Sequence, residues 1–252
     1  MNTSIGNILI EAARELQRNA SALLLAVAVP ALLAALLETF KTQYQQPFPI
    51  SLLTTIAMFF LYGQIAVTCH RIILLGPDSL PNRWGIYATA PVWRFFGAML
   101  VFLGIWMMGM MLIIPFVTPM LMAVEPGAAR ILALLIFSGL ALVAILAMSR
   151  VVLLFPSLAV SGGHDVNDII ELSAPVWARL AAIMLLAGIA TAIVAFPLTW
   201  LGLATDSFVI ELTSALIGCL AGIYTVAAIS CAYRAVLQVS PARADSERVE
   251  RA

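Results

Sequence analysis

Long apolar stretches dominate this chain and alternate with short polar segments. A helix that crosses a bilayer needs about 20 mainly apolar residues. Six stretches meet that length, at residues 20–40, 50–75, 94–123, 128–155, 179–203 and 208–237. Because they use almost the whole sequence, we predict an all-α polytopic membrane protein. We expect a single six-helix transmembrane domain over residues 1–240, followed by a polar cytoplasmic tail over residues 241–252.

A repeated tetrapeptide indicates that the chain contains an internal repeat. Ala-Pro-Val-Trp occurs at residues 90–93 and again at residues 174–177. In each copy an isoleucine stands seven residues before the tryptophan, and an arginine, Arg150 or Arg234, follows that isoleucine by 64 residues. A shorter first copy, found by spacing and pattern, ends at Arg71. Self-similarity at a fixed period is the signature of repeated units.

We therefore predict three repeated helical hairpins in the same orientation. Each has a short amphipathic segment, an outward span and a return span that ends in arginine. Parallel repeats of this kind are related by an axis along the membrane normal. The three units cover approximately residues 5–75, 83–157 and 166–238.

The segment before the second tetrapeptide has the pattern of an amphipathic helix. In residues 164–173 the apolar positions recur near helical spacing and the acidic positions lie opposite, which suits a helix lying in the membrane interface. Asp165 or Asn167 is expected to cap its start. Pro175 cannot continue that helix, so we predict a joint there between an in-plane cytoplasmic helix and a span. Pro91 is expected to mark the same joint in the second copy.

The residues after these joints are candidates for contact with lipid. Trp93 and Trp177 combine an apolar ring with a polar N–H, which favours the headgroup level. Arg94 and Arg179 are expected to extend toward lipid phosphates. Ordinary interfacial anchoring is the favoured interpretation, and a specific anionic-lipid site is the alternative. In the first copy, residues 10–21 have the same amphipathic pattern without proline.

The basic residues are distributed unevenly between the two sides of the predicted membrane domain. Eleven of the thirteen fall before the first span, in the even-numbered loops or after the last span. The other two are Lys41 and Arg130. The positive-inside rule then predicts that both termini lie in the cytoplasm.

Charge is scarce overall and nearly absent from the spans. Charged residues are 10% of the chain and apolar residues 63%, against about 25% and 45–50% in soluble domains. Ionisable residues inside a membrane usually mark ion pathways, so their scarcity argues against an ion-coupled transporter. Glu38, Asp206 and Glu211 lie near the outer ends of spans, where we expect a solvated or structural role.

No pattern in the sequence supports catalysis, and we assign no catalytic residue, cofactor or metal. The chain lacks H-E-x-x-H, G-x-S-x-G and P-loop motifs. His164, Asp165, Asp168 and Glu171 have a spacing that a metal site can use, but a capped, solvated helix face is the favoured interpretation. No basic patch suggests nucleic-acid binding.

Small residues in the last span predict a helix-packing face. Ser214, Gly218 and Gly222 recur at four-residue spacing, which allows two helices to approach closely. We expect an interface inside the chain, with a dimer contact as the alternative.

The region from residue 149 to residue 188 resembles the glycerophosphoryl diester phosphodiesterase membrane-domain family and related six-span bacterial membrane proteins. It has an arginine that ends a span, a leucine-rich run to Pro156, a short loop, an acidic amphipathic segment and a new span. Ser173 matches the family's serine at this place, and Ala-Pro-Val-Trp replaces its next residues. The resemblance implies a bacterial inner-membrane protein with helical hairpins and no established catalytic residues.

These patterns favour a non-enzymatic integral membrane protein, an envelope accessory or scaffold that acts through lipid or protein contacts. The expected partners are membrane lipids, with another membrane protein as an open alternative. A transporter of a lipid or amphipathic solute is the second hypothesis. An intramembrane enzyme is the third, and it requires polar groups of different spans to converge, for example Gln64, Thr68, Tyr224 and Ser230.

Overall fold

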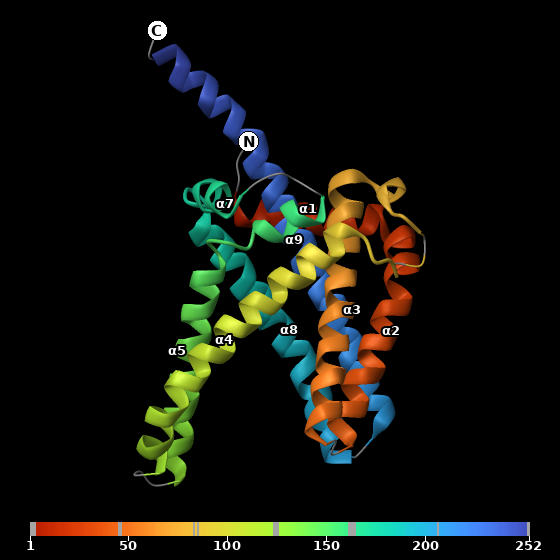
Figure 1. The fold of residues 1–252 in the computed structure, drawn as a ribbon, viewed down its shortest axis with the longest axis vertical. Coiled ribbons are helices and arrows are strands. Elements are labelled where there is room, and N and C mark those ends of the chain that lie inside the picture. The colour runs from red at the N-terminus through yellow and green to blue at the C-terminus, as the bar shows by residue number, and fades with distance from the viewer. Residues whose placement is uncertain are drawn as a thin grey trace.

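The computed structural model describes residues 4–250, apart from 45–46, 83, 85, 123–125, 161–164 and 206. All regular structure in these residues is helical (Figure 1). The helices are α1 (Ile5–Arg18), α2 (Ala20–Gln43), α3 (Phe48–Leu75), the 3-10 helix η1 (Pro77–Ser79), α4 (Ala90–Met122), α5 (Pro126–Met148), α6 (Leu154–Ala159), α7 (Val166–Ser173), α8 (Trp177–Thr205) and α9 (Phe208–Glu250).

Five of these helices are long and apolar enough to cross a membrane, namely α2, α3, α4, α5 and the part of α9 over Phe208–Gln238. α7 and the first half of α8 pass the same test together, which raises the number to six if that bent pair is one span. This confirms the prediction of a helical protein with several apolar helices of membrane-spanning length. The fourth stretch forms a shorter helix than predicted, because α5 ends at Met148 and turns precede α6. The ring of Pro156 would clash with the carbonyl four residues earlier in a continuous helix.

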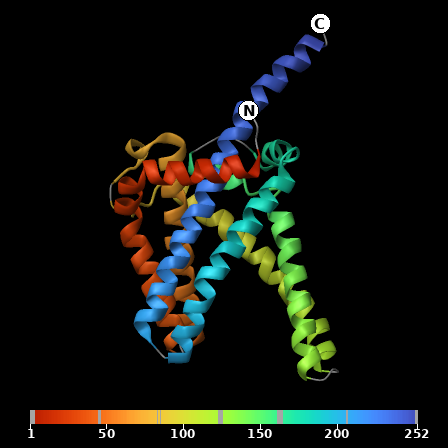
Figure 2. The ribbon, with the colours of Figure 1, turned by 180° about the vertical axis from the view of Figure 1, so that it is seen from behind.

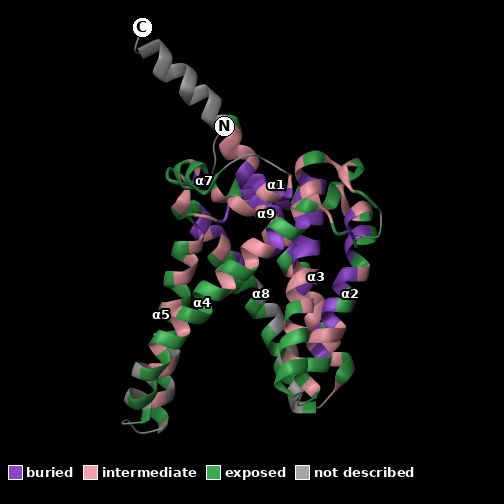
Figure 3. Ribbon diagram, viewed as in Figure 1, coloured by how far each residue is buried: buried purple, intermediate pink, exposed green. Residues whose placement is uncertain are grey.

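α9 is the central helix, and it packs against α1, α2, α3 and α8. Figures 1 and 2 show α1 lying across the long helices at the end where the N-terminus lies, while α4 and α5 diverge from α2 and α3. Most buried residues lie among α1, α2, α3 and α9 (Figure 3). We call these four helices the packed half, and α4 with α5 the open hairpin.

The predicted bend at Pro175 is confirmed. α7 and α8 meet at an angle of 89° across a break of three residues that contains this proline. Asp165 caps α7 through a capping box, in which its side chain accepts a backbone N–H and the Asp168 carboxylate accepts the backbone N–H of Asp165 (3.0 Å). This arrangement satisfies donors that the first helical turn leaves open.

The helix expected before Pro91 is not formed, and that prediction is wrong. The described residues between η1 and α4 contain no helix. Gln64 of α3 binds this segment instead, since its amide donates to the carbonyl of Tyr87 (2.6 Å) and accepts the N–H of the same residue (3.5 Å). The buried backbone of Tyr87 is therefore satisfied without a helical turn.

Candidate functional site

The four predicted lipid-interface residues lie at the starts of α4 and α8. Trp93 is 53% exposed, and its ring lies 5.3 Å from that of Phe60 in α3. Trp177 is partly buried beneath the guanidinium of Arg150, whose Cζ lies 4.8 Å from the ring centroid. Arg94 and Arg179 are both exposed. The two tryptophans therefore have different surroundings, and only Trp93 leaves most of its ring uncovered.

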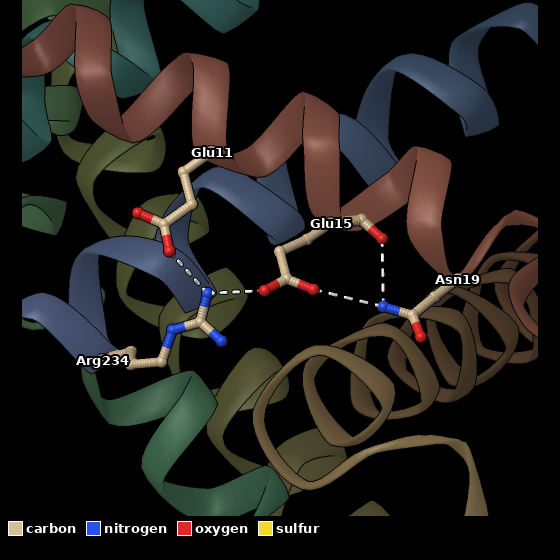
Figure 4. A network of polar contacts seen from close by, with 4 residues as sticks. All are labelled: Glu11, Glu15, Asn19 and Arg234. Atoms are coloured by element: carbon tan, nitrogen blue, oxygen red, sulfur yellow. Dashed lines mark hydrogen bonds and ion pairs between the residues drawn. The ribbon is translucent and has the colours of Figure 1, made fainter.

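Arg234 joins α9 to α1 through two carboxylates (Figure 4). One guanidinium nitrogen lies 2.8 Å from a Glu11 oxygen and 2.9 Å from a Glu15 oxygen. The amide of Asn19 donates to the other Glu15 oxygen (3.3 Å) and to the Glu15 carbonyl (3.0 Å). Glu11 and Glu15 are four residues apart on α1 and therefore share a face, a signal visible in the sequence. Their partner lies more than 200 residues away, and no local pattern identifies it.

The arginines that end the two earlier return spans also contact neighbouring segments. Arg71 donates to the carbonyl of Ser79 in η1 (2.7 Å) and to that of Ala159 in α6 (3.2 Å). Arg150 stacks on Trp177, and its carbonyl accepts a hydrogen bond from the hydroxyl of Ser173 in α7 (2.7 Å).

The polar residues proposed as an intramembrane site do not converge. Thr68 contacts the hydroxyl of Tyr87 (3.0 Å), on the segment that Gln64 also binds. Burial raises the pKa of the Tyr87 phenol, so this hydroxyl stays protonated over the physiological range. Ser230 and Tyr224 make their contacts elsewhere. Ser230 lies 2.7 Å from His70 Nδ1, and Tyr224 donates to the carbonyl of Leu9 in α1 (3.1 Å).

A pocket to which several polar side chains contribute lies between α2, α3 and α9, near the end of α2 and the start of α9 and beside the middle of α3. Its volume is about 220 Å³. The lining residues are Glu38, Thr39, Thr42, Tyr62, Glu211, Ser214, Ala215 and Gly218. The phenol of Tyr62 donates to a carboxylate oxygen of Glu38 (2.5 Å).

Glu211 is only 7% exposed, so of the solvated or structural role expected for it, the solvated alternative is wrong. Its Oε2 atom is buried and has no hydrogen-bond partner among the described residues. Glu38 is partly buried, and Asp206 lies outside the described residues. The acidic residues near the ends of the spans are visible in the sequence, but the meeting of Glu38 and Glu211 in one pocket with Tyr62 depends on how three helices pack.

The predicted packing face on α9 is close-packed at one of its three positions. Ser214 is buried at 5% exposure and lines the pocket. A Cβ added at Gly218 or Gly222 would meet no atom within 4 Å among the described residues. Contact of these two glycines with another molecule remains a prediction.

The described residues contain no group of three or more His, Cys, Asp or Glu that could hold a metal ion. His164, part of the metal constellation considered from the sequence, lies outside the described residues. Cys69, Cys219 and Cys231 are buried and unbridged.

No family model, curated protein or solved structure matches the chain. The resemblance seen in residues 149–188 therefore remains an expectation.

Proposed function

We propose that this chain is a non-enzymatic integral membrane protein, an accessory or scaffold that acts through lateral contacts with lipid or with another membrane protein. The open hairpin is the observation that carries this proposal. In the 18-residue apolar windows of α4 and α5 no described residue is buried, whereas 39% of the residues in the α2 window and 44% of those in the α9 window are buried.

The exposed positions of the open hairpin point in several directions around each helix. Ile105, Met107 and Met108 are 62%, 49% and 66% exposed on α4, and the consecutive residues Leu142 and Val143 are 46% and 63% exposed on α5. A flexible, polarisable methionine surface adapts to partners of different shape. Such a hairpin is suited to receive lipid chains or the helix of a partner.

The proposal includes three repeated hairpins in the inner membrane of a bacterium, with both termini in the cytoplasm. The distribution of basic residues supports that orientation. The three arginines support the repeat, because each contacts the segment that leads into another unit. Arg71 binds η1, Arg150 stacks on Trp177, and Arg234 binds α1. By this scheme α1 and α7 lie in the membrane interface.

A photo-crosslinking experiment tests the scaffold role. A photoreactive phenylalanine analogue replaces Phe137 in α5 or, as the matched control, Phe40 in α2, since both side chains are 45% exposed. In intact cells we expect a discrete protein or lipid adduct from position 137 that is several-fold stronger than from position 40. Equal adducts from both positions would show that the open hairpin has no special role and would contradict the proposal.

A second experiment tests the lipid contacts at the joints. We expect that replacing Arg94 and Arg179 together by Gln weakens retention of anionic lipid by about tenfold, as expected for the loss of two charge-assisted contacts. Arg14 and Arg18, which are exposed on α1, provide a control double variant with the same change in charge. Retention that falls equally in both variants would mean that only total charge matters.

A further inference from the structure

The pocket between α2, α3 and α9 is not part of the proposed scaffold surface. It lies near the end of α2 and the start of α9, because Glu38 is five residues before the end of α2 and Glu211 is three residues after the start of α9. Thr42, near its mouth, is exposed, while Thr39 and Glu211 are buried. The pocket is therefore accessible from outside and has a buried acidic floor.

Glu211 has a buried side-chain oxygen, Oε2, without a hydrogen-bond donor among the described residues. An ionised carboxylate in that state is costly unless a cation or donor approaches it. An occupant with N–H donors would satisfy the carboxylate.

The hydroxyl groups around Glu211 offer acceptors rather than donors. Each hydroxyl has one hydrogen to donate, and three of those hydrogens are already committed. Tyr62 donates to the Glu38 carboxylate (2.5 Å), Thr39 to the carbonyl of Ala35 (2.8 Å), and Thr42 to the carbonyl of Glu38 (2.9 Å). The lone pairs of these three oxygens can still accept hydrogen bonds. The lining therefore favours a cation with several N–H donors over an anion.

The size and composition of the pocket favour an organic cation over a bare metal ion. A volume of about 220 Å³ exceeds the roughly 30 Å³ that one water molecule occupies in the liquid. The described residues also place only two carboxylates here and contain no metal-binding group of three or more His, Cys, Asp or Glu.

We propose that this pocket binds a primary ammonium group, with Glu211 as its counterion. Glu38 and Thr39 accept the remaining N–H bonds, because a primary ammonium has three donors. Two sources supply this chemistry at the end of a membrane helix: a dissolved small amine, and the ethanolamine headgroup of a lipid. The proposal goes beyond the scaffold role and does not depend on the open hairpin.

The test uses the full chain in lipid nanodiscs. Binding of radiolabelled ethanolamine is measured in phosphatidylcholine discs at constant ionic strength. In parallel, detergent-extracted protein is assayed for retained phosphatidylethanolamine relative to phosphatidylcholine. Wild type and the control Glu171→Gln, which changes an exposed carboxylate on α7, are expected to bind equally. Glu211→Gln is expected to weaken binding by about tenfold or more, as for the loss of a charge-assisted hydrogen bond.

The two sources give different results that both support the proposal. Saturable binding of free ethanolamine indicates a dissolved amine, while selective retention of phosphatidylethanolamine alone indicates the lipid headgroup. Absence of both, or equal binding by wild type and Glu211→Gln, would overturn it.

Folding of the variant is checked through its thermal unfolding midpoint without ligand. This midpoint is expected to be close to that of wild type, because glutamine keeps the shape of the glutamate side chain. If Glu211→Gln does not fold, Thr39→Val, which removes an acceptor at nearly constant volume, is expected to weaken binding several-fold, and unchanged binding by it would overturn the proposal.

Discussion

The spans of the packed half, α2, α3 and α9, are about as apolar as those of the open hairpin, but the two regions are buried to very different extents. α5 has the highest mean hydropathy of the five candidate spans, yet none of the described residues in its apolar window is buried, while 44% of the α9 window is. Lipid tails are as apolar as leucine, so apolarity alone does not draw helices together in a bilayer. The difference between the two regions must come from close packing and polar contacts between helices.

Small side chains and hydrogen bonds between helices distinguish the packed half. Ala34 of α2 and Ala227 of α9 are completely buried, which allows neighbouring backbones to approach closely. Side chains also bond across helices, as in the contact between His70 and Ser230. The open hairpin packs chiefly near the start of α4, where Val92 and Phe95 are buried.

The largest effect is expected where a buried polar contact joins α3 to α9. His70→Ala leaves a cavity and removes the partner of Ser230, and we expect unfolding in detergent to become easier by about 2–4 kcal/mol. Leu135→Ala in the exposed part of α5 is the control and is expected to change stability by no more than about 0.5 kcal/mol. Comparable losses in the two variants would mean that the open hairpin is packed as firmly as α3 and α9.

A smaller effect is expected from adding volume rather than removing it. Ala227→Leu introduces a larger side chain at a completely buried position of α9 and should destabilise the protein by about 1–3 kcal/mol. Ala141→Leu makes the same change at an exposed position of α5, where thermal unfolding should be unaltered. A lowered midpoint in Ala141→Leu would reveal a close neighbour of the open hairpin.

The smallest effect concerns the link between α1 and Arg234. The Glu15 side chain is 14% exposed and that of Glu11 is 48% exposed. Glu15→Gln should therefore lower stability by about 1 kcal/mol, and Glu11→Gln by clearly less, because solvent screens the exposed pair. Thermal unfolding of both variants at low and high salt measures the two losses of stability. A larger loss in Glu11→Gln than in Glu15→Gln would contradict this prediction.

Local features of the fold could be predicted where they are caused by residues close together in the sequence. α2 begins at Ala20, where the first apolar stretch begins, and Asp165 caps α7 because its carboxylate reaches backbone donors within the same turn. The bend at Pro175 follows from the missing N–H of proline. Each of these depends on neighbours along the chain.

Features that depend on distant residues could not be predicted. Gln64 binds the backbone at Tyr87 and leaves no helix before Pro91. Glu211 lies near the end of an apolar span, as solvated carboxylates often do, but the packing of α2 and α3 buries it. The hydropathy of α4 and α5 likewise does not predict that the open hairpin diverges from α2 and α3. That arrangement depends on which distant helices pack against α4 and α5.

We propose that the helices of the open hairpin present apolar surface to the membrane over most of their length, while the helices of the packed half bury one face against one another. The most direct test is the accessibility of a nitroxide to dissolved oxygen in lipid nanodiscs, in a background with the three native cysteines replaced by alanine. Labels are attached at Leu135 of α5 and at Leu23 of α2, which are 64% and 4% exposed. We expect high oxygen accessibility at position 135 and low accessibility at position 23. Equally low accessibility at both positions would contradict the account, because the hairpin would then be covered by the rest of the chain.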